Sequence, residues 1–204
     1  MKWLLTTPLL LLCLYGNAQQ GNLCRLLIKS FNASDEGFAF LRPGTSADTI
    51  EDYTLGEDTV AAYGLKTGSI VQYKNLTSAK YSGKTFTAWS LFLSGQHQLL
   101  YDREWNDVKE TVTAQLTAFA KQYAEGCFPQ LQMSELILPV KDYDMDLLTY
   151  YFYPKQITIP KGADKTQIEA LLKESTYIEF SVRKPWLIRG YFIGYSVNGL
   201  HYNN

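Results

Sequence analysis

Histidine, cysteine and net positive charge are all scarce in this chain. Its 204 residues include two histidines and three cysteines, and 19 Lys and Arg stand against 20 Asp and Glu, so the formal net charge is −1. A near-neutral chain lacks the basic surface with which nucleic-acid-binding proteins neutralise phosphates. The sequence also contains no C-x-x-C pair and no Cys–His cluster. We therefore expect no nucleic-acid partner, no zinc site and no thiol redox centre.

Long apolar runs are missing as well. A membrane-spanning helix needs about 18 or more apolar residues, and the longest run, near the N-terminus, is shorter than that. Lys2 in front of this run and the small residues Gly16 and Ala18 behind it have the layout of an export signal. We expect residues 1–18 to be cleaved. Residues 19–204 would then be exported to the periplasm or the extracellular space, without a membrane-spanning segment.

Cleavage removes Cys13 and leaves Cys24 and Cys127. Two cysteines in an oxidising compartment are expected to form one disulfide. The enclosed loop of about 100 residues corresponds to roughly 4–5 kcal/mol of chain-entropy stabilisation. Two separate buried thiols are the alternative. An uncleaved N-terminal anchor, a buried N-terminal strand and lipidation at Cys13 are further interpretations of the N-terminus.

The composition, 46% hydrophobic and 19% charged, is that of a globular chain. Runs of β-branched and aromatic residues bounded by Gly, Pro and Asn predict many strands. Many strands interrupted by single helices favour an α+β fold with a largely antiparallel sheet. We read residues 45–68 as mainly loop and Gly95–Gln96 as a turn. The expected strands are Leu23–Phe31, Gly37–Leu41, Ser69–Tyr73, Thr85–Leu93, Gln98–Tyr101, Gln130–Pro139, Leu147–Tyr153, Gln156–Ile159, Tyr177–Val182 and Leu187–Val197.

Two helices are predicted. A stripe of apolar residues at steps of three and four predicts one long amphipathic helix over about 105–125. A short helix over about 164–174 opens at Asp164, with Gln167 three residues later as a capping-box partner. We expect a single α+β domain over 19–204; a subdomain boundary, if one exists, falls near 126–129. The residues of the long stripe are Trp105, Val108, Val112, Leu116, Phe119 and Tyr123.

Two short motifs resemble catalytic signatures, but the neighbouring sequence lacks the elements that each signature requires. Ser78–Thr85 lacks the first glycine of a phosphate-binding loop and precedes a predicted strand, where that loop requires a helix. We interpret it as a hairpin turn. Ser196 lies in a sequence close to the serine-hydrolase elbow, but no acidic residue follows it to complete a triad with His201. We interpret Ser196 as a polar position on the last strand.

Three carboxylates alternate at Asp142, Asp144 and Asp146. Alternation places them on one face of an extended segment, where oxygen ligands for calcium can converge. The glycine and glutamate of an EF-hand loop are missing, so outside carbonyls would have to complete the site. A solvated acidic strand edge that discourages edge-to-edge pairing is the other interpretation. We predict no other cofactor.

Tyrosine, at 15 residues, is the most abundant aromatic residue. A tyrosine offers both a ring and a hydroxyl, which suits contacts with proteins or glycans. Tyr151, Tyr153, Tyr191 and Tyr195 are the ligand-binding candidates on the C-terminal strands. Ordinary sheet packing is the alternative explanation of these residues.

The sequence therefore favours an exported, non-enzymatic binding or accessory protein of the cell envelope or extracellular space, which contacts a protein or glycan through an aromatic sheet face. The alternative is a secreted hydrolase that acts on a glycan or similar polymer through two carboxylates across a cleft. Its candidates are Asp102, Glu104 and the 142–146 group. An inhibitor of another secreted protein is a third hypothesis. His97 and His201 are interpreted as surface turn residues.

Overall fold

The structure is a computed structural model. It describes residues 23–46, 51–62, 65–98, 110, 113–114, 117–118, 120–122, 126–134, 146–183 and 190–203.

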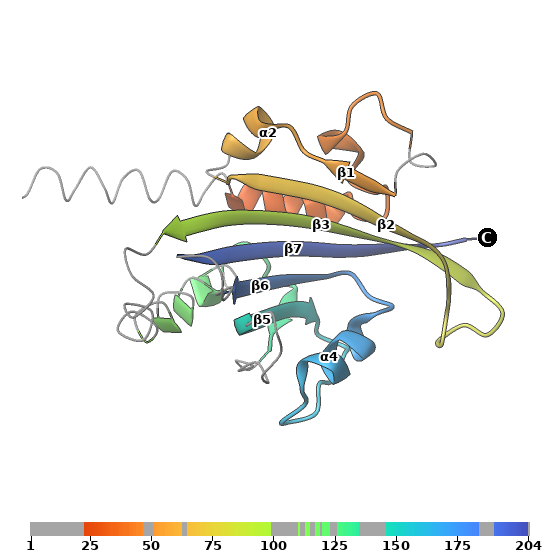
Figure 1. Ribbon diagram of the computed structural model, residues 1–204. Coiled ribbons are helices and arrows are strands. Elements are labelled where there is room, and N and C mark those ends of the chain that lie inside the picture. The colour runs from red at the N-terminus through yellow and green to blue at the C-terminus, as the bar shows by residue number, and fades with distance from the viewer. Residues whose placement is uncertain are drawn as a thin grey trace, which may run out of the picture.

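One antiparallel sheet of seven strands organises the described part of the chain, in the order β1-β2-β3-β7-β6-β5-β4 (Figure 1). The α+β class with a largely antiparallel sheet is confirmed. The centre of the sheet is the long ladder between β3 and β7, in which Phe86 pairs with Tyr202 at one end and Gln98 with Gly190 at the other. The strands are β1 (Asp52–Thr54), β2 (Thr67–Thr77), β3 (Thr85–Gln98), β4 (Leu131–Met133), β5 (Asp146–Pro154), β6 (Tyr177–Arg183) and β7 (Gly190–Tyr202).

The turn predicted at Gly95–Gln96 is wrong. Gly95 continues β3 and pairs with Ile193 of β7, inside an unbroken ladder. A long partner strand supplies hydrogen bonds on every second residue, and this outweighs the local turn preference of a single glycine. The hairpin turn predicted at Ser78–Thr85 is confirmed. It joins β2 to β3, and Gly83 within it has a φ of 79°.

The strand predicted over Leu23–Phe31 is also wrong, because residues 23–32 are helical. Leu23, Leu26 and Leu27 are all buried in the main hydrophobic core. Their spacing fits one face of a helix as well as it fits a short buried run, and periodicity alone does not separate the two. In Figure 1 this red helix lies against β2 and β3.

The third error concerns Gly37–Leu41, which forms a turn and the short 3-10 helix η1 (Ala39–Leu41) in place of a strand. Gly37 and Phe38 have φ values of 62° and 59°, which a strand does not allow. Arg42 fixes this turn. Its guanidinium is buried and donates hydrogen bonds to the carbonyl oxygens of Glu36, Gly37 and Thr45 at 2.7–3.0 Å.

The short C-terminal helix is confirmed as α4 (Lys165–Leu172). Asp164 is its N-cap and accepts a hydrogen bond from the Gln167 backbone N–H, while the Gln167 side chain accepts one from the Asp164 N–H. This is the predicted capping box. A further short helix, α2 (Glu57–Ala61), falls in the stretch predicted as mainly loop.

The long helix predicted over about 105–125 lies mostly outside the described residues. The residues of this stretch that the structure describes, 110, 113–114, 117–118 and 120–122, are all helical. Ala120 is buried in the main core, and the Thr117 hydroxyl lies 2.9 Å from the Tyr150 hydroxyl of β5. The length and full amphipathic stripe of this helix stay a prediction.

The cysteine pair joins two elements of the core. The Cys24 and Cys127 sulfur atoms lie at bonding distance, 2.09 Å, across a sequence separation of 103 residues. Cys24 belongs to the helix of residues 23–32, and Cys127 precedes the buried Phe128. The expected pairing is therefore present. Among the described residues, no helix is long and apolar enough to cross a membrane.

Candidate functional site

The two faces of the sheet differ in chemistry. Directly paired residues in antiparallel strands share a face, so the register defines rows that cross several strands. The row Ile70–Leu91–Val197–Ile178–Phe152 is wholly apolar and fully buried. It packs against the N-terminal helix and forms the main core. This face of the sheet therefore forms one side of the main hydrophobic core.

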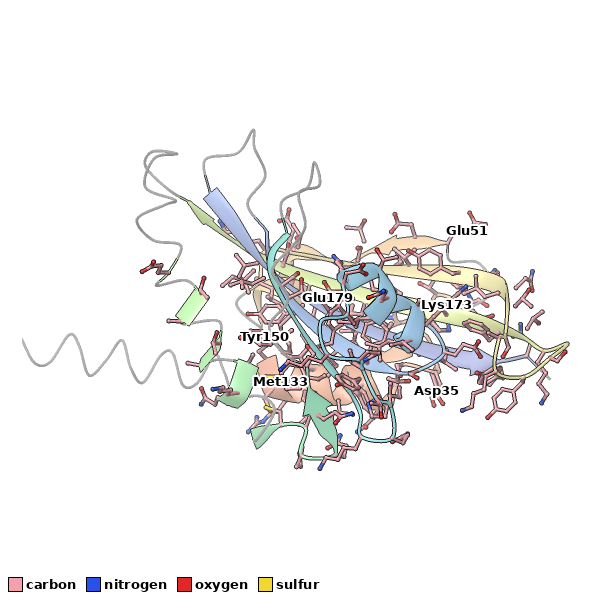
Figure 2. All side chains as sticks on the ribbon, turned by 90° about the horizontal axis from the view of Figure 1, so that it is seen from below. Asp35, Glu51, Met133, Tyr150, Lys173 and Glu179 are labelled. Atoms are coloured by element: carbon pink, nitrogen blue, oxygen red, sulfur yellow. A yellow bond between two sulfur atoms is a disulfide. The ribbon has the colours of Figure 1, made fainter. Side chains whose placement is uncertain are left out.

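The opposite face is rich in hydroxyl groups. The neighbouring residue on each strand points to this opposite face. These residues form the row Ser69–Phe92–Ser196–Glu179–Tyr151. The rows on either side bring Ser90, Ser94, Ser181, Thr149, Asn198 and Tyr177 to the same face. We call it the polar face. Figure 2 places Glu179 near the middle of the molecule.

The polar face is hollowed beside Glu179. A cavity of about 270 Å³ lies there, with the lining residues Phe92, Leu93, Ser94, Glu179, Ser181, Gly194, Tyr195 and Ser196. Glu179 is 8% exposed, and Phe92 on the wall is 39% exposed. The cavity therefore combines a buried carboxylate, several hydroxyls and one accessible ring. Such a mixture of an apolar wall with a few convergent polar groups is typical of small-molecule sites.

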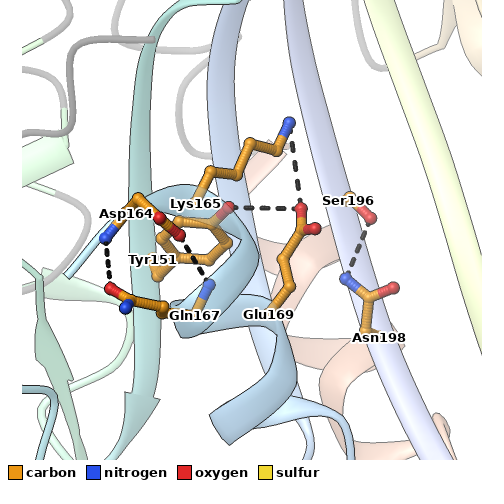
Figure 3. Close-up of polar contacts among 7 residues, drawn as sticks. All are labelled: Tyr151, Asp164, Lys165, Gln167, Glu169, Ser196 and Asn198. Carbon is orange, nitrogen blue, oxygen red and sulfur yellow. Dashed lines mark hydrogen bonds and ion pairs between the residues drawn. The ribbon is translucent and has the colours of Figure 1, made fainter. Parts of the chain in front are cut away.

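Hydrogen bonds order the polar groups next to the cavity. The Ser90 hydroxyl donates to the side-chain oxygen Oδ1 of Asn198 at 2.5 Å, and the side-chain nitrogen Nδ2 of Asn198 donates to the Ser196 hydroxyl at 3.0 Å. Figure 3 shows the Asn198–Ser196 contact on β7. These side chains are held in fixed positions, which reduces the entropy lost when a ligand binds.

Helix α4 covers the β5 end of the polar face. Its buried residues Ile168 and Leu172 form a second hydrophobic cluster with Tyr151 and Tyr153. On the same helix Glu169 accepts a hydrogen bond from the Tyr151 hydroxyl at 3.4 Å and lies 3.8 Å from the Lys165 ammonium (Figure 3). The capping box described above fixes the start of this helix, and with it the position of Glu169.

Two carboxylates influence the same tyrosines. Burial is the main cause that raises the pKa of Tyr151 far above its ordinary value of 10.0, and the negative charges of Glu179 and Glu169 raise it further. The pKa of Tyr177 is raised for the same three reasons. Both hydroxyls therefore stay protonated and remain hydrogen-bond donors near neutral pH. Glu169 and Glu179 therefore both lie near Tyr151 and Tyr177.

The predicted ligand-binding tyrosines do not share one exposed surface. Tyr151 and Tyr153 are buried beneath α4, with exposed fractions of 0% and 6%. Tyr195 is buried with its ring against Phe180 in the main core. The side chain of Tyr191 lies outside the described residues. A ligand-binding role of these four residues stays a prediction, but the exposed rings of the polar face are others.

Several other candidates fall outside the described residues. Asp142 and Asp144, the side chain of Asp146, the side chain of His97, and Asp102 with Glu104 all belong to this group. No cluster of three His, Cys, Asp or Glu residues suited to a metal ion occurs in the described ranges. Ser196 lies within β7 and accepts a hydrogen bond from Asn198, as expected for a polar strand position.

Of the residues that line the cavity, only Tyr195 was among the ligand-binding candidates from the sequence, and the others were missed. Their signal is present in β6, where Tyr177, Glu179 and Ser181 alternate with three apolar residues. The same alternation occurs at Ser90 in β3 and Ser196 in β7. Alternation identifies the polar side of each strand, but only the register shows that these sides meet.

No protein-family model matches this chain, and comparison with curated proteins and with solved structures finds no similar protein.

Proposed function

We propose that this is an exported, non-enzymatic binding or accessory protein of the periplasm or extracellular space, which uses the polar face of its sheet to contact a glycan or a protein. The observation that carries the proposal is the contrast between the two faces. One face is packed as core, whereas the other presents the cavity beside Phe92 and Glu179. Polar side chains that are already held in place by hydrogen bonds beside an accessible ring lose little entropy when a ligand binds, and this arrangement favours a role in binding.

Export rests on two observations. The first 18 residues have the layout of a cleavable signal. Cys24 and Cys127 lie at disulfide-bonding distance, and disulfides persist mainly in oxidising compartments. A membrane anchor plays no part in the proposal.

A secreted carboxylate-dependent hydrolase is the second candidate. The negative charges of Glu169 and Glu179 both raise the pKa of Tyr151 and of Tyr177, so both carboxylates lie near these tyrosines. Glycoside hydrolysis requires a pair of carboxylates. Glu169 is already engaged by Tyr151 and Lys165. This engagement favours a structural role for Glu169, and for that reason binding is preferred.

The test compares the wild type with a variant whose cavity is filled. At Gly194 an added Cβ would lie 3.0 Å from the Ser181 hydroxyl, so Gly194→Val places its methyl groups in the cavity. Leu171→Ala is the control, since Leu171 is 45% exposed on α4 and does not line the cavity. Full-length protein from an exporting host is applied to a glycan array and to fractionated envelope and culture proteins.

We expect a glycan or an identified protein that binds the wild type and Leu171→Ala but not Gly194→Val. Thermal unfolding of each variant checks that it is folded, and Phe92→Ala gives a second disruption of the same site. Equal binding by all four proteins, or no binding at all, contradicts the proposal. Turnover of a polysaccharide that Glu179→Gln and Glu169→Gln both abolish would establish the hydrolase instead.

A further inference from the structure

We infer that the ligand of the polar face is a linear, extended glycan of several sugar residues, laid along strand β3 between the rings of Phe92 and Tyr73. This inference rests on the proposed function and specifies the class of ligand. It is carried by the placement of the two exposed rings and by the chemistry of the residues between them.

The two rings lie on the same face. Tyr73 of β2 pairs with Ala88 of β3, and Phe92 lies four positions after Ala88 on the same strand, so the three side chains point to one side. The influence of Tyr73 on the pKa of Tyr177 agrees with this placement, because Tyr177 pairs with Asn198 on the polar face. Tyr73 is 47% exposed and Phe92 39% exposed. Both are accessible to a ligand.

The separation of the rings sets the length of the ligand. Ala88 and Phe92 are four residues apart on β3, which corresponds to about 13 Å along the strand. This span exceeds one sugar ring and matches a short oligosaccharide. A ligand that covers only the cavity would contact Phe92 and leave Tyr73 free.

The residues between the rings are suited to hydroxyl groups. Ser90, Asn198 and Ser196 lie there, the two serines each 7% exposed, and Glu179 and Tyr177 lie beside them in the paired rows. Hydroxyls, an amide and a carboxylate offer both donors and acceptors to the several hydroxyls of each sugar. The faces of the two rings can pack against the C–H groups of the sugars at the ends.

The same composition argues against a protein partner on this face. The buried cores of protein–protein interfaces are enriched in aromatic residues, Met and Arg and depleted in Ser and Glu. Here Ser90, Ser196 and Asn198 lie between the two exposed rings, and Glu179 lies beside them with Tyr177 as the one aromatic neighbour among these residues. A peptide that lay along β3 would also find no free backbone partners, because β3 is already paired on both sides by β2 and β7.

The test measures affinity against ligand length. Full-length protein is titrated, by calorimetry and by saturation-transfer NMR, with cello-, chito- and malto-oligosaccharides from the monosaccharide to the hexasaccharide. We expect at least one series in which affinity rises about tenfold or more from the monosaccharide to the longer members and then levels off.

Variants separate the two ends of the site. Tyr73→Ala should remove most of this gain with length, about tenfold, and leave binding of the shortest ligands unchanged. Phe92→Ala should weaken every member of the series. Leu171→Ala changes a similarly exposed apolar residue of α4 that does not line the cavity, and it should weaken none.

An affinity that does not depend on length, an unaltered length dependence in Tyr73→Ala, or no binding of any series overturns the glycan inference. A purified protein that binds the wild type but not Gly194→Val, with no sugar bound, overturns the inference and leaves the proposed function standing. If neither sugars nor proteins distinguish the wild type from Gly194→Val, both fail.

Discussion

Gly199 of β7 is in direct contact with Ser34, in the turn that follows the first helix: a Cβ atom built on Gly199 would lie 2.2 Å from the Cβ of Ser34. The contact is between two backbone segments rather than with the tip of a flexible side chain, since the Ser34 carbonyl carbon lies only 2.8 Å from the same point. The turn is therefore seated on the sheet at a position that only glycine allows.

Gly199→Ala should thus destabilise the protein, by about 2–3 kcal/mol, because the turn must move away from the sheet. Chemical denaturation measures this change. Gly95→Ala is the matched control on the neighbouring strand β3, since an added Cβ there meets no described atom within 4 Å. We expect its effect to stay within about 0.5 kcal/mol. Equal effects of the two substitutions would contradict the close contact between Gly199 and Ser34.

At Ser30 we predict a substitution that stabilises the protein. Its side chain is fully buried, and among the described residues its hydroxyl is the one buried side-chain group without a hydrogen-bond partner. Ser30→Ala removes this unsatisfied group and introduces a better helix former, so the free energy of unfolding should rise by about 1 kcal/mol. Ser34→Ala should lower it by about 1 kcal/mol, because the Ser34 hydroxyl donates to the Phe31 carbonyl at 2.8 Å. Denaturant midpoints that move in the same direction for both variants count against this account.

The cysteine pair should contribute a large part of the stability. Replacement of Cys24 and Cys127 by serine opens a loop that spans 103 residues of sequence separation. The chain-entropy model gives a loss of roughly 4–5 kcal/mol. Reduction of the wild type should have a similar effect, whereas a reductant should leave the double variant unchanged. An oxidised wild type that is no more stable than the double variant would falsify this role.

Glu174 gives the fold a dependence on pH. Burial by itself would raise the pKa of its carboxyl, but hydrogen bonds from Ser78, Tyr202 and the backbone N–H groups of Ala79 and Lys80 outweigh burial and lower the pKa below 4.5. These bonds hold both the β2–β3 turn and the end of β7 to the segment after α4. Since the pKa is lower in the folded chain, the carboxylate adds stability above pH 4.5, and this contribution is lost as the pH falls further.

Glu174→Gln should therefore be less stable than the wild type at neutral pH, and the difference should shrink as the pH falls below 4.5. Urea denaturation at a series of pH values measures it. Glu57→Gln is a suitable control, because Glu57 is exposed at the start of α2. A gap between Glu174→Gln and the wild type that is the same at every pH contradicts the proposed cause.

Some elements follow directly from local sequence, and others depend on contacts that sequence does not reveal. Asp164 and Gln167 predict the start of α4 because a capping box is made by neighbours in the chain. The run from Leu23 was misread because its apolar spacing fits either a helix or a strand, and only the sheet beneath it selects the helix. The cavity beside Glu179 could not be predicted, since it needs the register of β3, β7 and β6.

The most direct test of the central claim compares retention of bound glycan or protein by the wild type and by Gly194→Val, with Leu171→Ala and thermal unfolding as controls. The account predicts that Gly194→Val stays folded and loses binding, while Leu171→Ala keeps it. Full binding by a folded Gly194→Val would contradict the claim that the polar face of the sheet is the binding site.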